Sequence, residues 1–339
     1  MTDRRVLFTA PGIAELVEQE CKPLAPDRVR VETAFSTISS GTERARLTGE
    51  PNIDPTSAKD PPVVFPRTGG YSSAGTVVEV GSAVTDLAVG DRVALLGGHH
   101  GTHVAVTREN VFPIGGKVPF QEASMWHIAV FPLGAVRKCR VELGESALVM
   151  GQGVLGQMAV RLLRLAGAAP ILAADPVPEK RQRALALGAD YALDPFAPDF
   201  AEQVKALTGG GARVCIEVTG NGKALDGALD CMARFGRVAL LGCTRRSDFS
   251  IDYYRKVHWP GITLIGAHSG ARPELESHAG WWTEKDDVAA IRRLYELGRL
   301  QFSDMVEEVH SPLDVPEVFA RLAKEKSFPL VQFDWGLLQ

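Results

Sequence analysis

The sequence predicts an α/β fold with two domains: an antiparallel, barrel-like β domain and a doubly wound domain around a six-stranded parallel sheet. The first about 120 residues are rich in β-branched segments separated by Gly and Pro, which is typical of antiparallel strands. From Pro119 onward, short apolar strands alternate with helical patterns, as in a parallel sheet with crossover helices. At 339 residues, the chain is long enough for two hydrophobic cores.

The individual elements are predicted from hydrophobic patterns and turn residues. In the first domain, we expect strands at 28–34, 76–80, 92–95 and 103–107, with turns at 81–82 and 89–91. In the second domain, we expect strands at 147–150, 171–174, 191–193, 214–218, 237–241 and 263–265, with helices at 155–165, 178–187, 200–207 and 224–232. The last part of the chain predicts helices at 286–297 and 315–323 and a closing strand at 329–333.

A glycine-rich turn links the first strand of the predicted parallel sheet to its first helix. The turn has the spacing G-x-G-x-x-G and follows the apolar run 147–150. Its first glycine permits the tight turn, the second lets the backbone approach a pyrophosphate, and the third lets the helix pack close to the strand. The N–H groups at the helix N-terminus add an anion site. We therefore expect a dinucleotide to bind at Gly151, Gly153, Val154, Leu155 and Gly156.

An aspartate ends the next apolar strand. Asp175 follows the run 171–174, nineteen residues after the last glycine of the turn. A carboxylate at this place accepts hydrogen bonds from a ribose 2′-hydroxyl and repels a 2′-phosphate. The expected cofactor is therefore NAD rather than NADP, although Arg181 and Arg183 could meet a 2′-phosphate. The purely structural alternative is a glycine turn followed by an aspartate that caps a helix before Pro176.

Composition and charge exclude several classes of protein. Hydrophobic residues make up 45% of the chain and charged residues 23%, as in ordinary globular proteins. A formal net charge of −4 gives no basis for a nucleic-acid interface, which would need a basic patch. No apolar run approaches the about 20 residues needed to cross a bilayer, and no signal-peptide core is visible. We expect a cytoplasmic protein that binds neither nucleic acid nor membranes.

The five cysteines are scattered, without any C-x-x-C pair. Their odd number and mostly apolar neighbours favour buried free thiols. This spacing builds neither a disulfide framework nor a four-cysteine zinc site.

Several motifs together carry a resemblance that covers nearly the whole chain. They are Ser39-Ser40-Gly41-Thr42-Glu43, the glycine-rich run 69–81, Gly90-Asp91-Arg92-Val93, the mid-chain glycine turn, and the segments 187–190 and 236–238. In these motifs the chain resembles the medium-chain dehydrogenase/reductase family of alcohol and sorbitol dehydrogenases. The resemblance implies a GroES-like substrate domain at 1–126 and 271–339, a Rossmann domain at 127–270, and hydride transfer between an alcohol and NAD. It also implies a homodimer or homotetramer that pairs through the edge of the nucleotide-binding sheet.

The chain departs from the zinc-containing members of this family at the metal positions. The position of their thiolate ligand falls on Ser40, that of their imidazole ligand on Tyr71, and that of the adjoining glutamate on Ser72. The third ligand position falls at Trp126 or His127. The four-cysteine structural zinc lobe is replaced by the run 95–101. These variants resemble a zinc-lacking branch that includes bacteriochlorophyllide dehydrogenase relatives, so we expect no metal.

Without a metal, hydrogen-bond donors must stabilise the alcohol oxygen and a base must accept its proton. The candidates are Thr42, which matches the first proton relay of zinc members, Tyr71, His127 and His100. Our hypothesis is that Tyr71 or Thr42 holds the substrate oxygen while a histidine takes the proton. Ala45 stands where many members have a relay histidine.

Each candidate also has a structural alternative. Ser40 and Glu43 form a capping-box pattern, Tyr71 could pack against Pro66, and His127 could be a core imidazole. The glycine-rich loop with His99, His100 and His103 could collect a divalent ion with His127. A histidine that lines the substrate cleft is the favoured interpretation, because no carboxylate or thiolate accompanies the three locally.

Further cofactor contacts follow from the resemblance alone. Lys180 matches a family residue that reaches the ribose, and the segments around Thr219, Gly242 and Cys243 match those that flank the two riboses. Backbone near Gly266 matches the part that binds the carboxamide.

The substrate class is the least determined part. Histidines of the expected cleft and the polar, Trp-rich segment 268–283 favour a polyol, sugar or cyclitol; the segment could also be a packed linker. Three alternatives stay open: a zinc-free enone or quinone reductase, an enzyme that retains NAD for transient oxidation, and an NAD(H)-binding protein without turnover.

Overall fold

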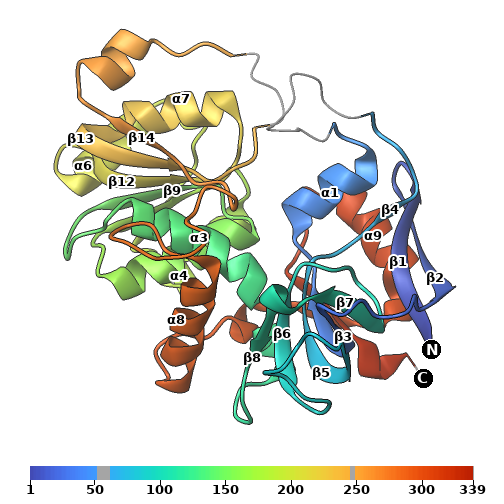
Figure 1. Ribbon diagram of the computed structural model, residues 1–339. Helices are drawn as coiled ribbons and strands as arrows, with labels where there is room; N and C mark the ends of the chain where they lie inside the picture. The colour runs from blue at the N-terminus through green and yellow to red at the C-terminus, as the bar shows by residue number, and fades with distance from the viewer. Residues whose placement is uncertain (52–61, 245–248, 339) are drawn as a thin grey trace. The chain divides into compact units, whose positions relative to one another are not determined.

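The computed structural model describes residues 1–51, 62–244 and 249–338, which form two compact units (Figure 1). The first unit comprises Met1–Ile128 and Ala290–Gln339, and the second comprises Ala129–Ala289. The predicted fold class is confirmed, because the first unit is a mainly antiparallel β domain and the second a doubly wound α/β domain. Within the described residues, no helix is both long enough and apolar enough to span a membrane.

The first unit is built on two sheets. In its described part, a three-stranded sheet has the order β2 (Ile13–Glu20), β1 (Thr2–Ala10), β4 (Arg67–Thr68). A seven-stranded sheet has the order β15 (Glu308–His310), β16 (Val331–Asp334), β3 (Arg28–Thr37), β5 (Ser72–Val80), β6 (Arg92–Leu96), β8 (Val111–Pro113), with β7 (His103–Thr107) also paired to β3. The helices that matter here are α1 (Ser40–Thr48), α2 (Phe120–Ala123) and α9 (Val315–Lys324).

The alternating pattern of these strands explains where the core of the first unit lies. Val29 and Val31 on β3, with Val93 and Leu95 on β6, are fully or almost fully buried inside the barrel-like sheet. A second apolar cluster forms where α9 lays its apolar face on the first hairpin, and it includes Phe319 and Phe8. The first hairpin and the end of the chain therefore share one core.

The second unit is a parallel sheet with helices on both faces (Figure 1). In its described part, the strand order is β11 (Tyr191–Leu193), β10 (Ile171–Ala174), β9 (Ala147–Met150), β12 (Ala212–Glu217), β13 (Met232–Leu240), β14 (Thr263–Gly266). The helices are α4 (Val154–Ala166), α5 (Pro178–Ala186), α6 (Phe200–Thr208) and α7 (Gly222–Asp230). β9 and β10 are buried at every residue, which explains why their sequences are uninterrupted apolar runs. All six predicted strands are present, with small differences at their ends.

All five cysteines are free, but the prediction that they are also buried is wrong for two of them, because Cys21 is only partly buried and Cys243 is exposed. Cys139, Cys215 and Cys231 are buried, whereas Cys243 is exposed.

The junctions between the units differ from the boundaries expected from the sequence. The structure places residues 271–289 with the second unit rather than the first. This segment packs on the end of α3 (Trp126–Lys138): the Arg137 guanidinium lies 3.5 Å from the Trp282 ring, and Lys138 Nζ lies 4.7 Å from the Trp281 ring. Arg137 Nε also donates to the buried Asp287 carboxylate at 2.7 Å. These contacts explain why the Trp-rich segment belongs to the second unit.

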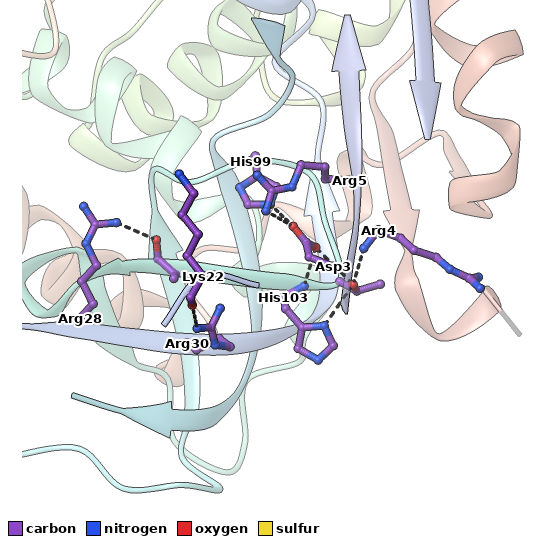
Figure 2. A network of polar contacts seen from close by, with 10 residues as sticks. Asp3, Arg4, Arg5, Lys22, Arg28, Arg30, His99 and His103 are labelled. Atoms are coloured by element: carbon purple, nitrogen blue, oxygen red, sulfur yellow. Dashed lines mark hydrogen bonds and ion pairs between the residues drawn. The ribbon is translucent and has the colours of Figure 1, made fainter. Parts of the chain in front are cut away.

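A buried aspartate joins β1 to the loop before β7 (Figure 2). Asp3 is 0% exposed; its Oδ2 accepts from His99 Nε2 at 2.8 Å and from Arg5 Nη2 at 2.6 Å, and its Oδ1 accepts from the backbone N–H of His103 at 3.0 Å. Burial by itself would raise the pKa of Asp3. The hydrogen bonds from His99 and His103 and the charges of His99 and Arg5 outweigh it, so the pKa lies below its ordinary value.

We expect Asp3→Asn to lower the free energy of unfolding by about 3 kcal/mol, because it removes the carboxylate from a buried ion pair. Since the folded-state pKa of Asp3 is lowered, its contribution to stability is complete above about pH 4, the ordinary pKa of Asp, and is lost as the pH falls through the lower folded-state value. Urea unfolding between neutral and acid pH measures both effects. Asp86→Asn is the matched control: Asp86 is 61% exposed in its pair with Arg108, so its loss should cost under about 1 kcal/mol. Equal losses for the two variants would contradict the prediction.

Candidate active site

The dinucleotide turn has the geometry that the glycine spacing predicts. β9 ends at Met150, and Gly151 follows with φ +94°, a conformation that favours glycine. A Cβ on Gly156 would lie 1.9 Å from the carbonyl oxygen of Gly151, so only glycine lets α4 start this close to the strand. A Cβ on Gly153, by contrast, would have no atom within 4 Å. The open space at Gly153 lies beside the N-terminus of α4, where a pyrophosphate can bind.

Asp175 is held firmly at the end of β10. It is buried; its Oδ2 accepts from the backbone N–H of Gln152 at 2.8 Å, and its Oδ1 accepts from that of Val177 at 2.9 Å. β10 pairs in parallel with β9, which brings the carboxylate next to the glycine turn. The Arg181 guanidinium donates to the carbonyl oxygens of Asp175 and Pro176, at 2.7 and 3.1 Å. One of the two arginines that could meet a 2′-phosphate is thus engaged with the backbone.

The other expected cofactor residues follow parallel strands of the same sheet. Thr219 is exposed after β12, Gly242 and Cys243 follow β13, and Gly266 ends β14. A Cβ on Gly242 would lie 2.1 Å from the backbone nitrogen of Gly220, so these two turns are in close contact. Lys180 is half-buried on α5. Because carboxyl ends of parallel strands meet at one edge, these turns lie on the side where such sheets bind ligands.

Sequence reasoning missed Glu217, which shapes the turn after β12. Its buried carboxylate accepts from the backbone N–H groups of Thr219 at 2.8 Å and Gly220 at 3.1 Å, and from the Thr219 hydroxyl. Burial raises the pKa of Glu217, and the hydrogen bonds partly oppose this. The sequence does contain a signal for this role: Glu217 ends an apolar strand two residues before Thr219-Gly220.

In the first unit, α1 begins with the side chains expected to bind the substrate. The helix starts at Ser40, with Ser39 as the N-cap, so the predicted capping box of Ser40 and Glu43 does not form. The Glu43 carboxylate accepts from the backbone N–H of Ser39 at 2.8 Å, whereas the Ser39 side chain makes no cap hydrogen bond. Thr42 is exposed on the first turn.

Tyr71 lies against both α1 and the start of α3. Its ring meets the His127 ring edge-on with 5.3 Å between centroids, and the side chains of Ser39 and Thr42 lie close to its hydroxyl. Burial raises the pKa of Tyr71 to about 12; the charge of Glu43 acts in the same direction, while the nearby Ser39 and Thr42 side chains oppose it. The phenol therefore stays protonated at neutral pH, where it is a hydrogen-bond donor and not a base.

His127 is half-buried and has a defined orientation. Its Nδ1 lies 2.7 Å from the carbonyl oxygen of Tyr71, which also accepts from the backbone N–H of Gly97 at 2.8 Å. Gly97 N is also 3.1 Å from Nδ1, but a carbonyl oxygen can only accept, so Nδ1 must carry the proton. In the neutral ring, Nε2 is then the nitrogen that accepts a proton.

His100 does not lie with these residues at the surface. It is 0% exposed, with Nδ1 2.8 Å from Ser36 Oγ and Nε2 2.9 Å from Glu43 Oε2. The other two histidines of the loop also diverge, because His99 pairs with Asp3 and His103 with Thr102. The neighbouring Trp126 is fully buried, so of the two residues at the third ligand position only His127 reaches partial exposure. The structure thus brings Thr42, Tyr71 and His127 together and separates His100 from them.

Comparison with known proteins decides the family. The alcohol dehydrogenase GroES-like domain matches residues 26–116, and the zinc-binding dehydrogenase domain matches residues 154–282. The chain belongs to the medium-chain, zinc-binding alcohol dehydrogenase superfamily. It is therefore a dehydrogenase that acts on alcohols.

Relatives of this alcohol dehydrogenase cover nearly its whole length. The D-guloside 3-dehydrogenase of Escherichia coli (strain K12) is 28% identical over 337 residues, which cover 93% of this chain and 95% of the relative. The L-threonine 3-dehydrogenase of Caldanaerobacter subterraneus subsp. tengcongensis is 28% identical over 308 residues, which cover 80% and 83%. The fold matches that of 2R,3R-butanediol dehydrogenase from Bacillus subtilis with a TM-score of 0.81 at 23% identity, over 98% of this chain and 99% of that one.

The superfamily typically binds zinc, but the donors of this dehydrogenase do not fit that ion. Zinc prefers thiolate, imidazole and carboxylate ligands. The positions that the resemblance predicts for its ligands hold the Ser40 hydroxyl, the Tyr71 phenol, and Trp126 or His127, while Ser72 Oγ donates to the Ser124 carbonyl at 2.6 Å. Across the described part of the chain, no three His, Cys, Asp or Glu side chains converge in a way that could hold a metal.

Two glycine substitutions test the dinucleotide turn. Gly156→Ala should lower the melting temperature and weaken binding of NADH, because its Cβ overlaps the Gly151 carbonyl. Gly153→Ala has space and an ordinary φ of −73°, so the free protein should melt as the wild type does. It should nevertheless bind NADH at least about tenfold more weakly, because the methyl group occupies the pyrophosphate's place. Circular dichroism melting and NADH fluorescence titration measure the two effects. Full affinity in Gly153→Ala would rule out this turn as the coenzyme site.

Proposed function

We propose that this dehydrogenase uses NAD, works without zinc, and oxidises a secondary alcohol of a polyol or sugar-like molecule. The observation that carries the proposal is the Tyr71–His127 pair at the positions aligned with metal ligands. One member is a phenol that stays protonated, and the other is an imidazole whose Nε2 accepts protons. Together they offer the donor and the base that alcohol oxidation needs in place of a Lewis acid.

In the proposed reaction, the Tyr71 hydroxyl donates a hydrogen bond to the substrate oxygen, and the exposed Thr42 hydroxyl adds a second polar contact. His127 Nε2 takes the hydroxyl proton as the C–H bond breaks, so the alcohol loses one proton and one hydride and becomes a ketone. The nicotinamide of NAD, when bound, supplies the hydride acceptor. Tyr71 strengthens its hydrogen bond as negative charge develops on the oxygen, which favours the transition state over the bound alcohol.

NAD is favoured over NADP by the carboxylate at the end of β10. Asp175 is charged, buried and anchored by two backbone N–H groups, so it cannot turn away from a 2′-phosphate without breaking them. The residues expected to bind the coenzyme are those of the glycine turn with Asp175, Lys180, Thr219, Gly242, Cys243 and Gly266.

The substrate class rests on the relatives and on the polar site. The Escherichia coli relative is named for a guloside, a sugar derivative, and the Bacillus subtilis fold relative for a butanediol. Hydroxyl groups at Ser40, Thr42 and Tyr71 suit a substrate with several hydroxyls.

We further propose that the protein works as a homodimer or homotetramer that pairs through β14. This strand is the last of its sheet, and Leu264 on it is 39% exposed. Trp259 and Phe235, near it in sequence and on the neighbouring strand, are each 68% exposed. An exposed strand edge beside large apolar side chains favours pairing with another copy.

The catalytic pair is tested by substitution. We expect Tyr71→Phe to lower kcat/KM about 100-fold or more, because one oxyanion donor is lost, and His127→Gln to lower kcat by a similar factor. Steady-state rates on a panel of polyols and glycosides with NAD measure this. Tyr191→Phe, on a half-exposed tyrosine of β11 in the other unit, should leave the rates unchanged. Wild-type rates in Tyr71→Phe would contradict the assignment.

Metal and coenzyme dependence are tested on the wild-type protein. We expect elemental analysis to find no stoichiometric zinc, EDTA to leave the rate unchanged, and NAD to be preferred over NADP. Stoichiometric zinc with loss of activity in EDTA would overturn the metal-free mechanism. A strong preference for NADPH with an enone would favour the reductase alternative, and tightly retained coenzyme would favour transient oxidation.

A further inference from the structure

The first unit contains a line of buried hydrogen bonds that ends beside the proposed catalytic tyrosine. Trp335 Nε1 donates to Ser36 Oγ at 2.9 Å, Ser36 Oγ lies 2.8 Å from His100 Nδ1, and His100 Nε2 lies 2.9 Å from Glu43 Oε2. Ser36, His100 and Glu43 are each 0% exposed. The four residues come from the end of the chain, β3, the loop after β6, and α1, so only the folded unit brings them together.

The donors fix the direction of this line. An indole N–H can only donate, so Ser36 Oγ accepts from Trp335 and has its own proton to give. At the other end, an ionised Glu43 carboxylate can only accept, so His100 Nε2 carries the ring proton, and Nδ1 of the neutral ring accepts from Ser36 Oγ. A neutral imidazole and a charged Glu43 therefore satisfy every donor in the line. A doubly protonated ring would leave the Ser36 proton without an acceptor among these partners.

The same histidine holds the backbone that carries Tyr71. The backbone N–H of His100 donates to the carbonyl of Gly69 at 2.8 Å, and a Cβ on Gly70 would lie 2.5 Å from His100 Cγ. Gly97, in the same loop, donates to the carbonyl of Tyr71. The backbone on both sides of Gly70 is thus attached to the loop that contains His100.

Glu43 acts from the other side. Its Oε1 accepts from the backbone N–H of Ser39, and it follows Thr42 directly. Ser39 and Thr42 are the residues whose side chains lie close to the Tyr71 hydroxyl. The Glu43 carboxylate therefore bonds the backbone at Ser39, next to the hydroxyls at the start of α1. His100 bonds the backbone at Gly69, just before Tyr71.

We infer that Glu43 and His100 are positioning residues for the proposed reaction: they hold the Tyr71 hydroxyl in place as a protonated donor to the substrate oxygen. This inference rests on the proposed function. His100 never meets the substrate; its Nε2 lies 2.9 Å from Glu43 Oε2 and holds that carboxylate in place. The Glu43 charge disfavours the phenolate, so Tyr71 remains a donor at the pH where His127 must be free of its proton.

The decisive comparison is between Glu43→Gln and Glu43→Asp. Glutamine has the size of glutamate but carries no charge. Its amide can donate to His100 Nε2, and His100 Nδ1–H can then donate to Ser36, so these hydrogen bonds remain with their directions reversed. An aspartate keeps the charge with a shorter reach. We expect Glu43→Gln to lower kcat about tenfold or more with KM and NADH affinity little changed, and Glu43→Asp to recover part of that loss. Glu79→Gln is the control, because it removes a carboxylate of the same unit that pairs with Arg30.

A pH profile separates positioning from mere stability. Among the residues that the structure describes, the charged and titratable groups near the phenol are Glu43 and Arg46 on α1, His127 on α3, and His100 in the loop. Losing the Glu43 charge should let Tyr71 ionise at lower pH. Ketone reduction by Glu43→Gln should then decline at a lower alkaline pH than in the wild type, and the ultraviolet tyrosinate signal that Tyr71→Phe abolishes should shift likewise. A purely structural role would lower the melting temperature without moving either curve.

The outcomes distinguish the two proposals. If Tyr71→Phe retains wild-type rates, the proposed function fails. If Tyr71→Phe is impaired while Glu43→Gln keeps the wild-type kcat and pH profile, only the positioning role fails. Should Glu43→Gln not fold, Ser36→Ala breaks the line further from the phenol, and wild-type kcat and pH profile in that variant would overturn the inference.

Discussion

Two buried carboxylates in the first unit, Asp3 and Glu43, need partners, and the same short loop supplies both. A charged carboxylate without water is costly unless it is paired and hydrogen-bonded. His99 and His100 meet this need for Asp3 and Glu43 respectively, and the loop that contains them also bonds the backbone of Gly69 and Tyr71. The loop is therefore tied to β1, to α1 and to the segment that carries the Tyr71 phenol. The place of Tyr71 depends on these carboxylates being satisfied.

The need to pair buried polar groups also explains how a member of a zinc-binding superfamily can keep an ordered site whose side chains are not zinc ligands. In a zinc site the metal charge holds the ligands in place. In the proposed site hydrogen bonds do so: the Tyr71 carbonyl oxygen accepts from the backbone N–H of Gly97 and orients His127. A carbonyl oxygen that fixes one tautomer, and a buried charge that disfavours the phenolate, give the two rings different roles. The proposed reaction uses this difference, because one group must donate while the other accepts.

Much of the coenzyme half was predictable from the sequence, because its signals are local. Gly151 needs its positive φ, Gly156 needs room for a close approach, and Asp175 ends the very next strand, so all three lie within one strand–helix–strand unit. The histidines were harder. The sequence does not distinguish His99, His100 and His103 from one another. The partner of His99 is Asp3, 96 residues away, and the partner of His100 is Glu43, 57 residues away. No local pattern reports such pairings, and the expectation that His100 faces the substrate arose from that gap.

The sequence by itself determined the fold class, the six strands of the parallel sheet and the glycine turn, because hydrophobic period and glycine spacing act over a few residues. Only the tertiary structure decided which imidazole accompanies Tyr71, which is buried, and that residues 271–289 pack with the second unit. Those outcomes depend on pairing of buried charges and on aromatic contacts between residues far apart in the sequence. In such contacts, what a side chain does is set by the group it faces rather than by its neighbours in the chain.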